Sequence, residues 1–201
     1  MTTAKKYLEI LREREPQLWK EPLKESGFTE KDLSDIEKGL GYKLPVPYRE
    51  FLLSYEMPKD ITVLVSFCGD SFACSWSETF SREKNGYIPR PEFDIGPTVE
   101  FEWHNMQGHS GADFLKNLQQ EQKTQDYCPC FLEAGFIRIG NVYGYLVYLD
   151  LVSGGIVTIH EEGVYDMMGA GVDWASKSEV RKYMETRELY ICKDFNDFLR
   201  F

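Results

Sequence analysis

The chain has 201 residues, with 23 Lys and Arg against 33 Asp and Glu, so its formal net charge is −10. Hydrophobic residues make up 42%, too many for a disordered chain, yet no apolar run reaches the ~18 residues that would span a membrane. The acidic excess argues against nucleic acid as a direct ligand, because phosphate binding requires surplus Lys and Arg. We therefore expect one globular domain with an elaboration, and contact with neither membrane nor nucleic acid.

The compartment is indicated by the first residues and by the cysteines. The residues from Met1 to Glu9 lack the apolar core of a signal peptide. The five cysteines form an odd, unpatterned set that does not resemble a disulfide framework. Both observations predict a cytoplasmic protein with reduced thiols.

The first quarter of the chain predicts three helices. An apolar stripe over residues 7–11 begins the first helix, which Pro16 is expected to end near Arg14. Thr29 is expected to cap the second helix through a capping box, and Gly41 to end it. The third helix is expected within residues 44–55, where prolines stand only at the head.

From residue 61 the pattern becomes one of strands and then of helices. The tract 145–151 is apolar on both faces, which predicts a central strand, and its short connections predict an antiparallel meander. Because helices and strands are segregated along the chain, we predict an α+β fold. The expected strands are 61–67, 98–103, 136–140, 145–151 and 156–160, and the further expected helices are 112–123, 178–188 and 195–201.

Three segments resemble the SUKH superfamily, and they occur in the order of that family. Residues 35–45 (DIEKGLGYKLP), followed by the Tyr-x-x-Phe-Leu of 48–52, resemble its opening helix pair. Residues 139–151 (IGNVYGYLVYLDL) resemble its central hairpin, and residues 193–199 (KDFNDFL) resemble its closing helix. The resemblance implies a SUKH-like domain over residues 29–201 with an insertion at about 69–129, preceded by an N-terminal helical extension over residues 1–28.

The same resemblance implies a protein-binding function without enzymatic activity. Many bacterial members resemble immunity proteins, which neutralise polymorphic toxins that are often nucleases or deaminases. Fungal relatives regulate cell-wall synthesis through protein contacts. We thus expect a cytoplasmic immunity protein that occludes a basic toxin domain. The alternative is a regulatory or scaffold protein of the cell-wall-synthesis-regulator type that binds an endogenous protein.

Catalytic and metal-binding alternatives have weaker support in the sequence. His104 and His109 lie five residues apart, with Cys128 and Cys130 farther along, but one Cys-Pro-Cys lacks the paired spacing of zinc sites. No local signature marks a cysteine nucleophile, and neither glycine-rich phosphate motif is present. We therefore expect no metal, no cofactor and no enzyme activity, with an enzyme that lacks a recognisable motif as the third hypothesis.

Alternating carboxylates and apolar residues at 99–103 (VEFEW) mark the strongest candidate for a binding surface. On a strand, Glu100 and Glu102 would share one face and Trp103 would lie on the other. The simpler interpretation is a half-buried strand with a solvated acidic face; the functional one is an acidic strip that engages a basic partner. Because aromatic residues are enriched at interface hot spots, the expected partner-binding residues are Glu100, Glu102, Trp103, Trp76, Tyr143 and Tyr145.

Overall fold

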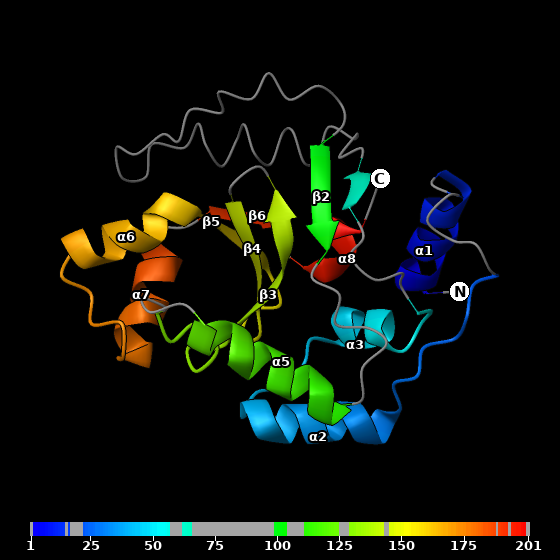
Figure 1. The fold of residues 1–201 in the computed structure, drawn as a ribbon, viewed down its shortest axis with the longest axis horizontal. Coiled ribbons are helices and arrows are strands. Elements are labelled where there is room, and N and C mark those ends of the chain that lie inside the picture. Colours follow the sequence, from blue (N-terminus) through cyan, green and yellow to red (C-terminus); the bar gives the residue numbers. More distant parts are fainter. Residues whose placement is uncertain are drawn as a thin grey trace.

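The fold is α+β, as predicted, with one antiparallel sheet between two groups of helices (Figure 1). The computed structural model describes residues 2–14, 16, 22–56, 62–65, 99–103, 111–124, 129–142, 145–187, 189–192 and 194–199. Six strands follow one another across the sheet in chain order, which confirms the predicted meander and extends it. The strands are β1 Thr62–Val65, β2 Val99–Trp103, β3 Phe136–Val142, β4 Tyr145–Asp150, β5 Ile156–His160 and β6 Leu189–Cys192.

The helices cover both faces of the sheet and enclose two hydrophobic cores. The larger core contains side chains of α1, α2, α3, α5 and α8, and the smaller core contains those of α6 and α7. Figure 1 shows α6 and α7 at one end of the molecule and α1 at the other. The helices are α1 Thr3–Arg14, α2 Glu30–Leu40, α3 Val46–Leu52, α5 Gly111–Thr124, α6 Glu161–Gly169, α7 Lys177–Arg187 and α8 Phe195–Phe198.

Strand β4 is central, as its apolar sequence predicted. All six of its residues are buried, and it pairs with β3 on one side and β5 on the other. Val147 and Leu149 belong to the larger core, whereas Leu146 and Tyr148 belong to the smaller one. This alternation follows from the period of two along a strand and explains why neither face carries solvent-exposed polar residues.

The second helix begins and ends where the sequence predicted. The Thr29 hydroxyl accepts a hydrogen bond from the Asp32 N–H, while the Asp32 carboxylate accepts one from the Thr29 N–H at 2.8 Å, which completes the capping box. Gly41 ends α2 with a φ of 74°, a left-handed conformation that glycine adopts without strain. The chain then turns directly into α3, so that α2 and α3 are held close together.

Helix α1 ends at Arg14, as predicted, and is part of the larger core. Its buried side chains are Ala4, Tyr7, Leu8 and Leu11, each at most 3% exposed, and its closest helical neighbour is α3.

The predicted insertion also contributes to the sheet, because β2 pairs between β1 and β3. Helix α5 packs on α2, where Gly39 leaves room for the side chain of Leu115.

Two elements were not predicted. Helix α6 follows β5 without a connecting loop, and β6 is a strand of four residues that pairs with β5. Helix α6 ends at Gly169. In the part of the chain that the structure describes, no helix is long and apolar enough to cross a bilayer.

Candidate functional site

The predicted partner-binding residues fall into three groups in the structure. Trp76 and Tyr143 lie outside the described residues. Glu100, Glu102 and Trp103 lie on β2, which forms the predicted strand, with Glu100 opposite Leu64 and Glu102 opposite Thr62 of β1. The structure describes the backbone of these three residues and not their side chains, so the acidic strip stays a prediction.

The remaining predicted residue, Tyr145, lies in the core. Its side chain is 8% exposed and its ring packs edge-on against His160, with the ring centroids 4.9 Å apart. Strand β3 separates Tyr145 from β2, so the two lie about 10 Å apart across the sheet. The described geometry therefore gives Tyr145 a packing role at the β4–β5 pair.

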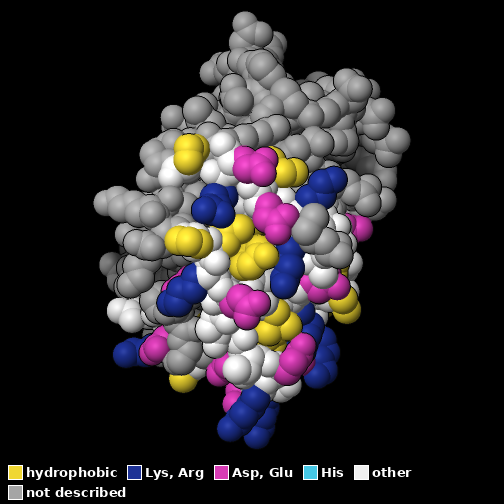
Figure 2. Space-filling model, turned by 90° about the vertical axis from the view of Figure 1, so that its right-hand side faces the viewer, with side chains coloured by type: hydrophobic (Ala, Val, Ile, Leu, Met, Phe, Trp, Pro, Cys, Tyr) yellow, Lys and Arg dark blue, Asp and Glu magenta, His cyan; other side chains and the backbone are white. Residues whose placement is uncertain are grey.

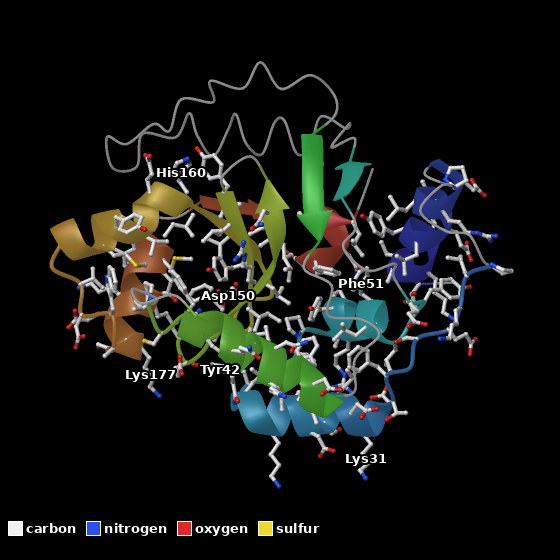
Figure 3. The ribbon with its side chains drawn as sticks, in the orientation of Figure 1. Lys31, Tyr42, Phe51, Asp150, His160 and Lys177 are labelled. Atoms are coloured by element: carbon white, nitrogen blue, oxygen red, sulfur yellow. The ribbon has the colours of Figure 1, made fainter. Side chains whose placement is uncertain are left out.

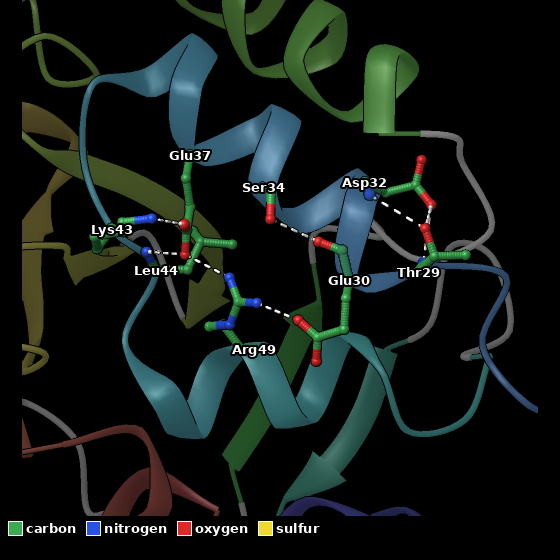
Figure 4. A network of polar contacts seen from close by, with 8 residues as sticks. All are labelled: Thr29, Glu30, Asp32, Ser34, Glu37, Lys43, Leu44 and Arg49. Atoms are coloured by element: carbon green, nitrogen blue, oxygen red, sulfur yellow. Dashed lines mark hydrogen bonds and ion pairs between the residues drawn. The ribbon is translucent and has the colours of Figure 1, made fainter.

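The first of two buried polar clusters centres on Glu37 of α2, which is 6% exposed (Figure 4). Its Oε2 accepts a hydrogen bond from Lys43 Nζ at 2.6 Å, and its Oε1 accepts hydrogen bonds from the Leu44 N–H at 3.2 Å and Arg49 Nη1 at 2.5 Å. Arg49 also pairs with Glu30 at the start of α2. One carboxylate thus joins α2, the connection that follows it, and α3.

The environment of Glu37 determines its charge state. Burial raises the pKa of the Glu37 carboxyl, but hydrogen bonds from Lys43, the Leu44 N–H and Arg49 lower it by more, so the net pKa is below the usual value of 4.5. Because charge-assisted hydrogen bonds favour the ionised form, Glu37 is a carboxylate at neutral pH. A carboxylate whose acceptor sites are occupied by its own chain is suited to holding structure rather than to transferring protons.

The second cluster centres on Asp150, which is fully buried at the end of β4 (Figure 3). Arg181 Nη2 of α7 lies 3.1 Å and 3.0 Å from its two oxygens, and the Val152 N–H and Ser153 hydroxyl donate to it at 2.9 Å and 2.6 Å. Arg181 also donates to the Ala134 carbonyl at 2.9 Å. This cluster fixes the β4–β5 turn against α7.

The described thiol does not have the properties of a nucleophile. Burial, together with the nearby Glu133 carboxylate, raises the pKa of the Cys130 thiol, so the reactive thiolate is disfavoured. The other residues of the metal alternative (His104, His109 and Cys128) lie outside the described residues. Where side chains are described, no three His, Cys, Asp or Glu converge as metal ligands would.

Among the residues whose side chains are described, the most exposed large apolar side chains occur at two separate places. Val46 is 66% exposed and Val152 is 61% exposed, and both lie beside a contact between Pro45 and Gly154, where the start of α3 meets the β4–β5 turn. Tyr165 on α6 is 63% exposed. Helix α6 carries Glu161, Glu162 and Asp166 and no Lys or Arg.

A third surface surrounds Tyr55, just after α3. The Lys5 ammonium lies 5.3 Å from the centre of the Tyr55 ring, and the Tyr55 hydroxyl lies 3.4 Å from Glu9 Oε1. Tyr55 is therefore held against α1. Lys24 and Glu56 form an ion pair of 2.7 Å beside it. Figure 2 looks onto the α1 end of the molecule, where apolar side chains gather in the middle and Lys, Arg, Asp and Glu surround them. We call the set Lys5, Glu9, Lys24, Tyr55 and Glu56 the Tyr55 surface.

Comparison with known proteins agrees with the fold. The model of the SMI1/KNR4 family (SUKH-1) matches residues 27–200, so the chain belongs to this family. A search of the curated proteins and a search of the solved structures returned no match. Helix α1 lies before the matched residues, although its apolar side chains are part of the larger core.

Proposed function

We propose that this protein acts by binding another protein, as an immunity protein that neutralises a nuclease- or deaminase-type toxin by covering its active cleft. The observation that carries the proposal is membership of the SMI1/KNR4 (SUKH-1) family over residues 27–200. The two buried carboxylates support it, because the side chains of Glu37 and Asp150 are both engaged in joining elements of the fold. The site of action is proposed to be the cytoplasm.

The charge of the protein favours a basic partner. A net charge of −10 attracts a basic toxin domain over a distance of about one Debye length and accelerates the encounter. The proposed contacts are the acidic strip of β2, with Glu100, Glu102 and Trp103, together with Trp76 and Tyr143. Tyr145 is buried in the core and is not one of them. Exposed Tyr165 on the acidic helix α6 is an additional candidate anchor.

The second candidate function is a regulatory or scaffold role toward an endogenous protein. The chain belongs to the SMI1/KNR4 family. The resemblance of its motifs to the SUKH superfamily implies a relation to the fungal members, which regulate cell-wall synthesis through protein contacts. Both functions use binding without chemistry, and they differ in the identity of the partner.

The experiment that separates them is affinity capture from the native host with the full chain as bait, followed by mass spectrometry. A captured toxin domain, which the chain silences when both are produced in one cell, supports the immunity function. A captured host protein involved in wall synthesis or signalling supports the regulatory function. Failure to retain any protein at low salt would contradict both, because each requires a stable protein partner.

A further inference from the structure

The Tyr55 surface has the composition of a protein interface. A typical interface has an apolar, aromatic centre surrounded by polar and charged groups. Around the Tyr55 ring lie Lys5, Glu9 and the Lys24–Glu56 pair, and apolar and charged side chains stand side by side at the α1 end (Figure 2). Tyr55 and the neighbouring Leu23 and Leu53 are half-buried, so each keeps apolar area available for contact. Tyrosine provides a large contact area at a small cost in conformational entropy, which favours it as an anchor.

Tyr55 is also held in place before any partner arrives. Lys5 lies over its ring, Glu9 lies at its hydroxyl, and the backbone of Tyr55 forms an isolated antiparallel bridge with Glu25. The Glu56 N–H donates to the Lys24 carbonyl at 2.7 Å, which ties the two strand-like segments together. Because ordering side chains at an interface lowers affinity, an anchor fixed in advance binds more tightly.

The distribution of charge indicates which partner this surface fits. Residues 1–26 carry six Lys or Arg against five Glu, whereas residues 27–201 carry 17 basic against 28 acidic residues. The acidic residues 27–201 of two copies therefore repel each other, whereas the nearly neutral residues 1–26 add no net repulsion. At the Tyr55 surface both signs alternate, so each charge can meet its opposite on a second copy across a two-fold axis.

We propose that the Tyr55 surface is the contact between two copies of this chain in a symmetric dimer. Helix α1, which lies outside the residues matched by the family model, supplies Lys5 and Glu9 to it. Tyr55 forms the centre of the contact, and the Lys24–Glu56 pair forms part of its rim. The dimer leaves α6, at the opposite end of the molecule from α1, available for the partner of the proposed function, and it is independent of the identity of that partner (Figure 1).

The test is the mass of the full chain in solution, measured by light scattering and by sedimentation at loading concentrations from about 1 to 100 μM, the range of moderate dimer affinities. We expect the wild type to move from monomer to dimer within this range. Lys24→Glu places like charges at the contact and is expected to raise the dimer dissociation constant at least about tenfold, as for a close charge pair. Lys24 is 78% exposed, so the variant is expected to fold, which circular dichroism checks.

Two further variants make the result specific. Lys31→Glu changes the net charge equally, but its side chain points away from α2 at another face, so the dimer dissociation constant should change less than about threefold (Figure 3). The swap Lys24→Glu with Glu56→Lys restores opposite signs and is expected to restore the dimer. A wild type that stays monomeric at 100 μM, or a dimer that Lys24→Glu and Lys31→Glu affect equally, would overturn the proposal. A third outcome is a chain that stays monomeric but captures a protein partner less well with Lys24→Glu and not with Lys31→Glu. The Tyr55 surface would then be the binding site for that partner and not a dimer contact.

Discussion

Glu37 shows how a single buried side chain holds two helices and the turn between them. Its three donors come from positions six, seven and twelve residues farther along the chain. The spacing within a helix could not reveal these partners, because only residues three or four apart meet on one helix face. The sequence therefore predicted both ends of α2, but not the burial of Glu37.

Replacing Glu37 by Gln removes the charge and leaves a side chain of the same shape. We expect a loss of about 1.5–3 kcal/mol in the free energy of unfolding at pH 7, because the hydrogen bonds it accepts come largely from charged donors. Urea denaturation of wild type and variant measures this loss. Asp35→Asn on the exposed side of α2 is the matched control and is expected to stay within about 0.5 kcal/mol of wild type.

The same variant has a defined dependence on pH. The Glu37 pKa is lowered in the folded protein, so its contribution to stability is present above the unfolded value near 4.5 and is lost as the pH falls through the folded value. The stability difference between wild type and Glu37→Gln is therefore expected to shrink below pH 4.5. A difference that stayed constant down to about pH 3, well below the unfolded value near 4.5, would contradict the role of the ionised carboxylate.

The ion pair between Arg181 and Asp150, on the other face of the sheet, can be tested in the same way as the Glu37 cluster. Arg181→Met replaces the guanidinium, which lies 5.0 Å from the centre of the Phe136 ring, by an apolar side chain of similar length, and it leaves the fully buried Asp150 without its cation. We expect a loss of about 3–5 kcal/mol in the free energy of unfolding, the usual result of breaking a buried ion pair. Lys177→Met, at an exposed position on the same helix that points outward in Figure 3, is expected to change it by less than about 0.5 kcal/mol.

At the scale of elements, the strongly patterned segments were predictable, whereas α6 and β6 were not. Helix α2 has a cap, an apolar stripe and a terminal glycine, and β4 has an unbroken apolar sequence, so each signal agreed with the final structure. Helix α6 contains Gly163 and begins directly after β5, which removes the usual signals of a helix start. Strand β6 has four residues, too few for a periodic pattern to identify it.

Helix α1 allows a prediction about the N-terminal segment. Leu8 is fully buried in the larger core, so Leu8→Ala is expected to lower the free energy of unfolding by about 2–5 kcal/mol, as in other cores. Thermal denaturation followed by circular dichroism checks this, and Lys6→Ala on the exposed face of α1 serves as the control. If Leu8→Ala were as stable as Lys6→Ala, α1 would not be part of the core, and the segment before the family-matched residues would be an appendage.

At the scale of the whole molecule, composition and pattern predicted more of the fold than of the binding surface. The segregated elements indicated an α+β protein, and the chain belongs to the family that its motifs resemble. The binding surface was harder to predict, because exposure is a property of the folded molecule. Tyr145 looked like an anchor in the sequence but is buried by its strand neighbours, whereas Tyr55 and Tyr165 carried no distinguishing local pattern.

The net charge of −10 makes a prediction about association kinetics. If the captured partner is basic, its association rate constant is expected to fall by at least about tenfold as the ionic strength rises from about 0.05 to 0.5 M, because screening shortens the reach of the attraction. Stopped-flow fluorescence with the purified pair measures this. An association rate constant that does not change with ionic strength would mean that the net charge of −10 maintains solubility and does not accelerate binding.

Titration of the partner's own activity is the most direct test of binding without chemistry. Increasing amounts of the full chain are added to a fixed amount of the captured toxin domain, and the remaining toxin activity is measured. If the chain acts by covering the toxin, activity falls in proportion to the chain added and reaches its minimum near one equivalent. Full activity in the saturated complex would contradict occlusion, and complete loss of activity at far less than one equivalent would show that the chain acts as an enzyme.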